Sequence, residues 1–191
     1  MTAYVSEFEA IWSASGLRKH LRYLLIDFLG QQVAPTDQEA LLLEKALCNP
    51  DEQALVLKAI TGSPGWFLRF ADGYIAEAMT KNEMTAKLTV PILITAFKDS
   101  PEIVTRLVVA HWTSDASNDR RIWSVLQSAP LWTETFLAIA KDVVIRSDFS
   151  GLFVDPVIAT LGVSQPQMAM ALLRTVLDHQ LVCAIEQAAL A

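Results

Sequence analysis

Apolar residues recur at intervals of three and four positions along most of the chain, which is the spacing of one face of an α-helix. Leucine and phenylalanine form the clearest such face, and aliphatic residues form two more. The three faces contain Leu21, Leu24, Leu25, Phe28 and Leu29; Leu55, Val56 and Ile60; and Leu172, Val176, Leu181 and Ile185. The alternation of apolar and polar residues that marks a half-buried strand is nearly absent. The pattern therefore predicts an all-α protein.

Helix starts are expected where proline follows a capping residue. Proline suits the first helical position because its missing N–H would have no partner there, and a preceding Ser or Asn side chain caps the turn. Asn49-Pro50, Ser63-Pro64 and Ser100-Pro101 have this form. Thr36 and Glu39 have the spacing of a capping box, in which each side chain accepts a hydrogen bond from the other residue's backbone N–H.

About ten helices follow from the periodicity and these start signals. Residues 88–94 are the one plausible strand because they are rich in β-branched side chains, but Pro91 would remove a hydrogen bond from a central strand. We interpret this segment as a helix start or a kink. The expected helices cover residues 3–15, 17–33 (the first two being separate or one broken helix), 37–48, 50–61, 64–80, 84–98, 101–112, 118–128, 130–146, 152–162 and 165–188.

The chain matches itself at a shift of 65 to 66 residues, and the match includes seven of its eight prolines. Trp66 and Phe70, which follow Pro64, correspond to Trp132 and Phe136. Helices of similar length that begin with proline would produce some matches by coincidence, but aromatic residues at fixed offsets favour a true repeat. The matched prolines are Pro35, Pro101 and Pro166; Pro64 and Pro130; and Pro91 and Pro156.

A period of this length is about twice the 34-residue helical hairpin of common solenoids, so one unit would contain two hairpins. We expect a single all-α domain, residues 1–191, organised as an α-solenoid-like helical-repeat array. The general layout is like that of HEAT or armadillo arrays, although no signature of either family is present. The alternative is a closed globular helical bundle. The expected parts of the array are a half unit at 1–48, repeat units at 49–114 and 115–180, and a C-terminal extension at 181–191.

The composition is unusually apolar for a soluble protein, with 52% hydrophobic residues and a mean hydropathy of +0.33. Either the core is continuous or some apolar surface is reserved for a partner. The acidic net charge of −6 argues against sequence-independent nucleic-acid binding. Cys48 and Cys183 are interpreted as small buried residues in a reducing compartment. We expect a cytoplasmic protein, because no apolar stretch is long enough to span a bilayer and the N-terminus does not resemble a signal peptide.

No group of residues has the spacing of a catalytic, metal or cofactor site. His20, His111 and His179 lie far from one another and from any cysteine, whereas metal ligands are clustered. Phosphate-binding and nucleophile motifs are absent from the sequence. The carboxylates at Asp51-Glu52 and at 37–39 fall at expected helix N-termini, where the helix dipole explains them. We therefore expect no metal and no cofactor, and we favour a protein that is not an enzyme.

The most polar stretch of the chain, residues 113–121, is the candidate surface for a protein or peptide partner. Tryptophans border it, and tryptophan and arginine are enriched at binding hot spots. The competing and favoured interpretation is a solvated turn in which Ser117 or Asn118 caps the next helix. Trp66 and Trp132 are interpreted as core residues. The candidate partner-binding residues are Trp112, Asp115, Asp119, Arg120, Arg121 and Trp123.

Two oppositely charged segments lie in the first quarter of the chain, and they either pair within the fold or form separate patches. The basic one contains Arg18, Lys19, His20 and Arg22, and the acidic one contains Asp37, Glu39, Glu44, Asp51 and Glu52.

The C-terminal helix is apolar around most of its circumference, although a terminal repeat normally has a polar outer face. We expect its surplus apolar surface to pack against a second copy, most simply as a two-fold homodimer, or against a missing neighbour. In the alternative bundle, the N-terminal helices fold back over it. The candidate self-association residues are Met168, Leu172, Val176, Leu181 and Ile185.

These observations favour a non-enzymatic helical-repeat scaffold or adaptor that binds a protein or peptide. One alternative is a helical enzyme or small-ligand sensor whose site assembles only in space. Another is the helical-repeat fragment of a larger regulatory protein. A deep pocket lined by several polar residues would favour the enzyme or sensor, whereas a shallow groove or an exposed apolar strip would favour the scaffold.

Overall fold

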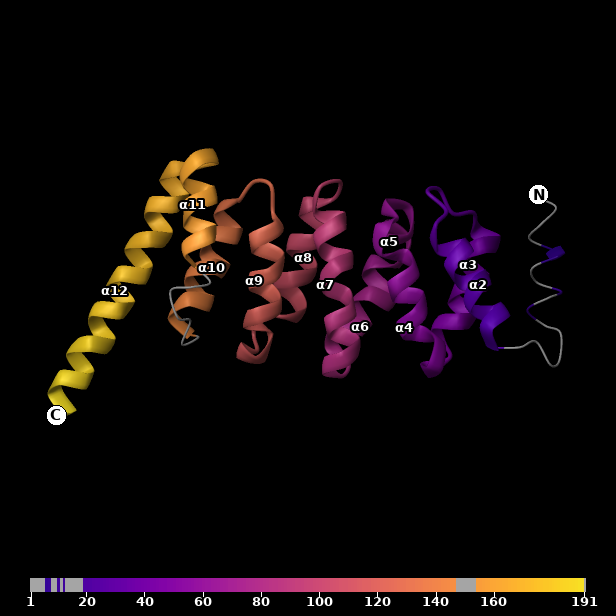
Figure 1. Ribbon diagram of the computed structural model, residues 1–191, viewed down its shortest axis with the longest axis horizontal. Helices are drawn as coiled ribbons and strands as arrows, with labels where there is room; N and C mark the ends of the chain where they lie inside the picture. Colours follow the sequence, from indigo (N-terminus) through magenta and orange to yellow (C-terminus); the bar gives the residue numbers. More distant parts are fainter. Residues whose placement is uncertain (1–5, 8–9, 11, 13–18, 147–153, 191) are drawn as a thin grey trace. The chain divides into compact units, whose positions relative to one another are not determined.

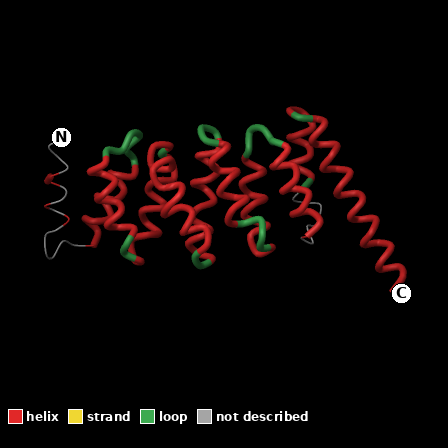
Figure 2. Tube along the Cα trace, turned by 180° about the vertical axis from the view of Figure 1, so that it is seen from behind, coloured by secondary structure: helices red, strands yellow, loops and turns green. Residues whose placement is uncertain are grey.

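The computed structural model describes residues 6–7, 10, 12, 19–146 and 154–190, and in the last helix it describes side chains as far as Val182. Every regular element in these residues is a helix, and none is a strand (Figure 1, Figure 2). The all-α prediction is therefore confirmed. Most of the expected helix at 3–15 lies outside the described residues. The chain divides into two compact units, Met1–Leu107 and Val108–Ala191, and the boundary falls within one helix.

The described part of the first unit follows the predicted succession of helices closely. The expected helix at 64–80 is interrupted by a π-helical turn that contains the exposed Gly73. The elements are α2 (Lys19–Gly30), α3 (Asp37–Leu47), α4 (Pro50–Ala59), the 3-10 turn η1 (Ile60–Gly62), α5 (Pro64–Phe70), the π turn η2 (Ala71–Ile75), α6 (Ala76–Thr80), α7 (Glu83–Phe97) and most of α8 (Pro101–His111).

Local capping explains why α3 and α4 begin where they do. The Thr36 backbone N–H donates to the Glu39 carboxylate at 2.7 Å, and the Glu39 backbone N–H donates to the Thr36 hydroxyl at 3.3 Å, so the predicted capping box is confirmed. Asn49 accepts a hydrogen bond from the Asp51 backbone N–H at 3.2 Å at the start of α4. The β-branched segment at 88–94 is helical as well and lies, with Pro91, inside α7.

Ser63 precedes α5 but does not cap it. Its hydroxyl donates to the carbonyl of Gln32 at 2.7 Å and ties the start of α5 to the loop after α2. Gly30 makes a close contact possible nearby, because a Cβ at this position would lie 2.6 Å from the Cβ of Ala59 at the end of α4. The α2–α4 contact thus needs glycine for steric reasons.

The charged segments do pair in part within this unit. The Arg22 guanidinium binds the buried Glu52 carboxylate at 2.8 Å, and it also lies 4.7 Å from the centre of the Trp12 ring. Arg69 pairs with Asp37 at the surface, also at 2.8 Å. Cys48 corrects one prediction, since it is an exposed free thiol rather than a buried residue.

The described residues of the second unit form the end of α8 and four further α-helices. Its elements are the 3-10 turn η3 (Ala116–Asn118), α9 (Asp119–Ser128), α10 (Glu134–Arg146), α11 (Asp155–Ser164) and α12 (Pro166–Leu190). Helix α12 packs against α10 and α11. It runs away from both helices towards its C-terminal end (Figure 1, Figure 2).

Trp132 lies in the loop before α10, which begins at Glu134 rather than at the expected residue 130. The side-chain amide of Gln165 holds this loop, because its oxygen accepts from the Trp132 N–H at 2.6 Å and its nitrogen donates to the Trp132 carbonyl at 2.8 Å. The matched prolines also occupy different places. Pro64 is the first residue of α5, but Pro130 lies in the loop.

No helix among the described residues combines the length and the apolar character that crossing a membrane requires.

Candidate functional site

The two tryptophans that border the polar segment 113–121 are buried. Trp112 and Trp123 have almost no exposed surface. Neither ring is available to a partner on the surface of this unit. The prediction that they frame an exposed contact surface is therefore not supported by their positions, because the sequence pattern of a hot spot does not distinguish a buried aromatic ring from an exposed one.

Asp119 is a buried residue that stabilises the fold rather than an exposed contact residue. It is the first residue of α9 and is nearly fully buried, and its carboxylate accepts a hydrogen bond from Arg146 at 2.6 Å. A second guanidinium nitrogen of Arg146 donates to the carbonyl of Thr113 at 2.5 Å. Arg146, at the end of α10, thus joins the start of α9 to the segment that follows α8.

The remaining candidates in this segment are a cap and two arginines in different environments. Exposed Asp115 accepts a hydrogen bond from the Ser117 backbone N–H at 2.8 Å and caps η3. This backbone bond, with a further bond from the Ser117 side chain, holds the pKa of Asp115 below its usual value. Arg121 donates to the side-chain oxygen of buried Asn118, whereas Arg120 is exposed. Asp115 thus caps η3. Asn118, one of the two residues expected to cap the next helix, is the N-cap residue of α9, but its side chain makes no capping hydrogen bond.

The two arginines are expected to differ in their effect on stability. Arg121→Ala should lower the free energy of unfolding by about 1 kcal/mol, because a hydrogen bond to a buried amide is lost. Arg120→Ala should change it by less than about 0.5 kcal/mol, as is usual at exposed positions. Chemical denaturation followed by circular dichroism measures both values. Equal effects of the two substitutions would contradict this assignment.

The five candidate self-association residues on α12 do not share one face. Leu172 is fully buried, Met168 and Val176 are half-buried, and Leu181 is exposed. The side chain of Ile185 lies outside the described residues. Because Leu172 packs inward, it is not available to a second copy, and the predicted set has to be corrected.

A different set of α12 residues forms the exposed face, which we call the α12 strip: Gln167, Met170, Arg174, Leu177 and Leu181. The exposed fractions of Met170, Leu177 and Leu181 are 50%, 54% and 62%. These three side chains lie on one side of the helix, because the five positions of the strip are separated by three, four, three and four residues. The spacing was visible in the sequence, but the apolar residues around the rest of α12 obscured it.

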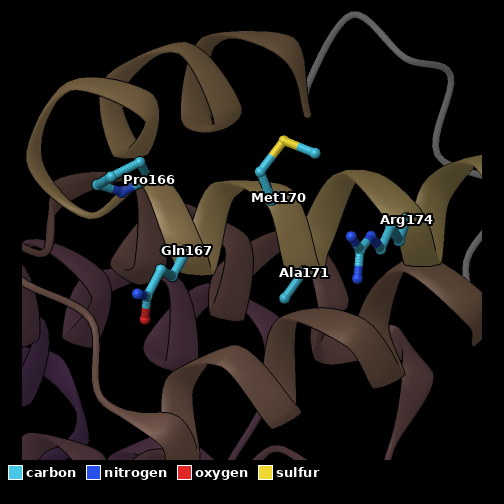
Figure 3. A pocket seen from close by; sticks show the side chains of 5 residues that line it. All are labelled: Pro166, Gln167, Met170, Ala171 and Arg174. Atoms are coloured by element: carbon cyan, nitrogen blue, oxygen red, sulfur yellow. The ribbon is translucent and has the colours of Figure 1, made fainter.

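A shallow depression of about 380 Å³ lies at the N-terminal end of the α12 strip (Figure 3). Figure 3 shows the side chains that line it, which follow one another along the first turns of α12. They are Pro166, Gln167, Met170, Ala171 and Arg174. The described lining residues thus all come from one helix, and one helix face does not surround a small molecule as a ligand pocket does.

The described residues contain no group of three or more His, Cys, Asp or Glu side chains that is able to hold a metal ion. Tyr74 lies in the π turn η2. Burial raises the pKa of its hydroxyl, and the nearby Cys48 and Glu44 raise it further.

Comparison with protein-family models, with curated proteins and with solved structures finds no match for this chain.

Proposed function

We propose that this protein is a non-enzymatic scaffold or adaptor that binds a protein partner through the α12 strip. The observation that carries the proposal is the row of three half-exposed apolar side chains, Met170, Leu177 and Leu181, on one side of a long helix. Contiguous apolar surface of this kind is a common mark of protein–protein interaction sites. The helix-in-groove and helix-pair modes of recognition use anchors at this spacing.

The proposal includes the helical-repeat array, and the order of the helices supports it. At a shift of 65 to 66 residues, α4, α5 with α6, α7 and α8 correspond to α9, α10, α11 and α12. Trp66 and Trp132 correspond as well, and both are buried. Each indole N–H donates to a leucine carbonyl, but the two acceptors, Leu29 and Leu126, are not at equivalent positions of the repeat. In such an array the terminal helix covers the preceding repeat with one face and normally has a polar outer face, so the apolar residues of the α12 strip depart from that rule and favour a partner. A cytoplasmic location is part of the proposal and agrees with the free thiol of Cys48.

The test compares two double variants of the full chain. Leu177→Glu with Leu181→Glu places two charges on the α12 strip and should reduce partner retention by at least about tenfold, because burying an unpaired carboxylate is costly. Leu41→Glu with Leu68→Glu is the matched control, since these leucines are 55% and 56% exposed on α3 and α5. Affinity purification from the source cell followed by quantitative mass spectrometry measures retention.

The proposal requires proteins that the wild type and the control variant retain and that the α12 variant loses. Circular dichroism should show unchanged helix content for both variants, because all four positions are exposed. If the α12 variant retains the same proteins in the same amounts as the wild type, the α12 strip is not the binding surface.

A further inference from the structure

The α12 strip has the period of a helix–helix seam. Positions separated alternately by three and four residues form the contact line of paired helices, and three of the five strip positions are apolar. The opposite side of α12 contains Ala169 and Leu172, which are buried in the second unit. The strip therefore lies on the side of α12 that faces away from α10 and α11, and it is available for a second helix.

From Met170 to Leu181 the spacing of the strip is the same in both directions along the helix, and these two apolar ends are similar in kind. Met170 and Leu181 lie at equal distances from a point between Thr175 and Val176, and so do Arg174 and Leu177. A two-fold interface uses the same patch on both subunits and therefore requires a patch that is complementary to itself. Two antiparallel α12 helices related by an axis at this point meet that requirement, because each Met170 lies level with the second copy's Leu181.

Charge complementarity selects the same arrangement. Arg174 and Asp178 are both exposed on this side of α12, and among the described residues neither forms an ion pair within the chain. In the antiparallel pair, Arg174 lies level with the second copy's Leu177 and next to its Asp178. The two-fold axis repeats the contact, so two such ion pairs border the apolar seam and fix its register.

We propose that the partner of the α12 strip is a second copy of this chain, bound as an antiparallel, two-fold α12 pair centred between Thr175 and Val176. This inference rests on the proposed function, because it identifies the protein that the α12 strip binds. It commits to a specific register, in which Met170 meets Leu181 and Arg174 meets Asp178 across the axis.

A charge exchange tests this register in the full-length protein. Wild-type protein at micromolar concentration should have twice the 21.1 kDa mass of one chain in multi-angle light scattering. Arg174→Asp and Asp178→Arg should each raise the dimer dissociation constant by about tenfold or more, because each places like charges face to face at two symmetric points. The double variant R174D/D178R should restore the dissociation constant to within about threefold, since opposite charges meet again.

The outcomes separate this inference from the proposed function. Circular dichroism controls for folding, and both positions are exposed, so the helix content should not change. A wild type that remains monomeric at about 100 μM overturns the inference. A dimer that still forms in the L177E/L181E variant overturns it as well. So does an unchanged dimer dissociation constant in Arg174→Asp and Asp178→Arg. If the wild type is monomeric while L177E/L181E still loses a retained protein, the α12 strip binds a different protein and the proposed function stands.

Discussion

Trp66→Ala is expected to lower the free energy of unfolding by about 3–5 kcal/mol, the usual cost of truncating a buried tryptophan. The Trp66 ring is fully buried and stacks on Phe70 at a centroid distance of 5.2 Å. Its indole N–H donates to the Leu29 carbonyl at 2.8 Å, so the substitution also leaves a buried carbonyl without this donor. Denaturation followed by circular dichroism measures the loss.

Trp132→Ala should have an effect of similar size in the second unit, because its ring is also buried and donates to the Leu126 carbonyl at 3.0 Å. Leu68→Ala and Leu131→Ala are the matched controls, since both leucines are exposed and lie close in sequence to the two tryptophans. Each control should change the free energy of unfolding by less than about 0.5 kcal/mol. A loss of less than about 1 kcal/mol for either tryptophan would show that its ring is peripheral to the core.

The elements that were predictable are those whose determinants lie within a few residues of each other. The Thr36–Glu39 capping box spans one helical turn, and Asn49 caps α4 through a residue two positions away. Neither depends on the rest of the fold. The helical state of the segment around Pro91 was also predictable, because a proline disfavours a central strand wherever that strand lies.

The local predictions that were wrong depend on distant partners. Helix α5 begins at Pro64 as predicted, but the Ser63 hydroxyl does not cap it, because this hydroxyl binds the carbonyl of Gln32, 31 residues earlier. Pro130 resembles a helix start, but Gln165 holds the backbone of Trp132 in a loop from 33 residues further along the chain. Sequence spacing contains no information about such contacts, so the hydrogen bonds that decide the backbone conformation were not predictable.

In the candidate site, too, the local feature was predictable and the feature that depends on distant contacts was not. An apolar C-terminal helix was evident from the sequence, but its free face depends on which side packs against α10 and α11. Packing turns Leu172 inward and leaves Met170 and Leu177 outside, which the periodicity of the helix alone did not indicate. The sequence also did not show that the tryptophans beside the polar segment are buried, because tryptophan is enriched both in cores and at interfaces.

Arg146→Met is expected to lower the free energy of unfolding by about 3 kcal/mol, although methionine keeps much of the side-chain volume. The Asp119 side chain is only 4% exposed and the Arg146 side chain 31%. The positive charge of Arg146, 2.6 Å away, compensates the negative charge of this buried carboxylate. The second oxygen of Asp119 has no hydrogen-bond partner among the described residues, so removing Arg146 also removes its main counter-charge. The substitution further releases the carbonyl of Thr113.

Two comparisons identify the buried charge as the cause. The double variant D119N/R146M should lose less stability than the sum of the two single variants, because each single variant leaves one partner uncompensated and the double variant leaves neither charge. Arg69→Ala breaks an ion pair of similar length with Asp37, in which both side chains are largely exposed, and should cost less than about 1 kcal/mol. Denaturation curves of the four variants measure these differences. Additive losses at Asp119 and Arg146 would mean that the two side chains act independently, and the cost of Arg146→Met would then come from lost packing and from the Thr113 hydrogen bond.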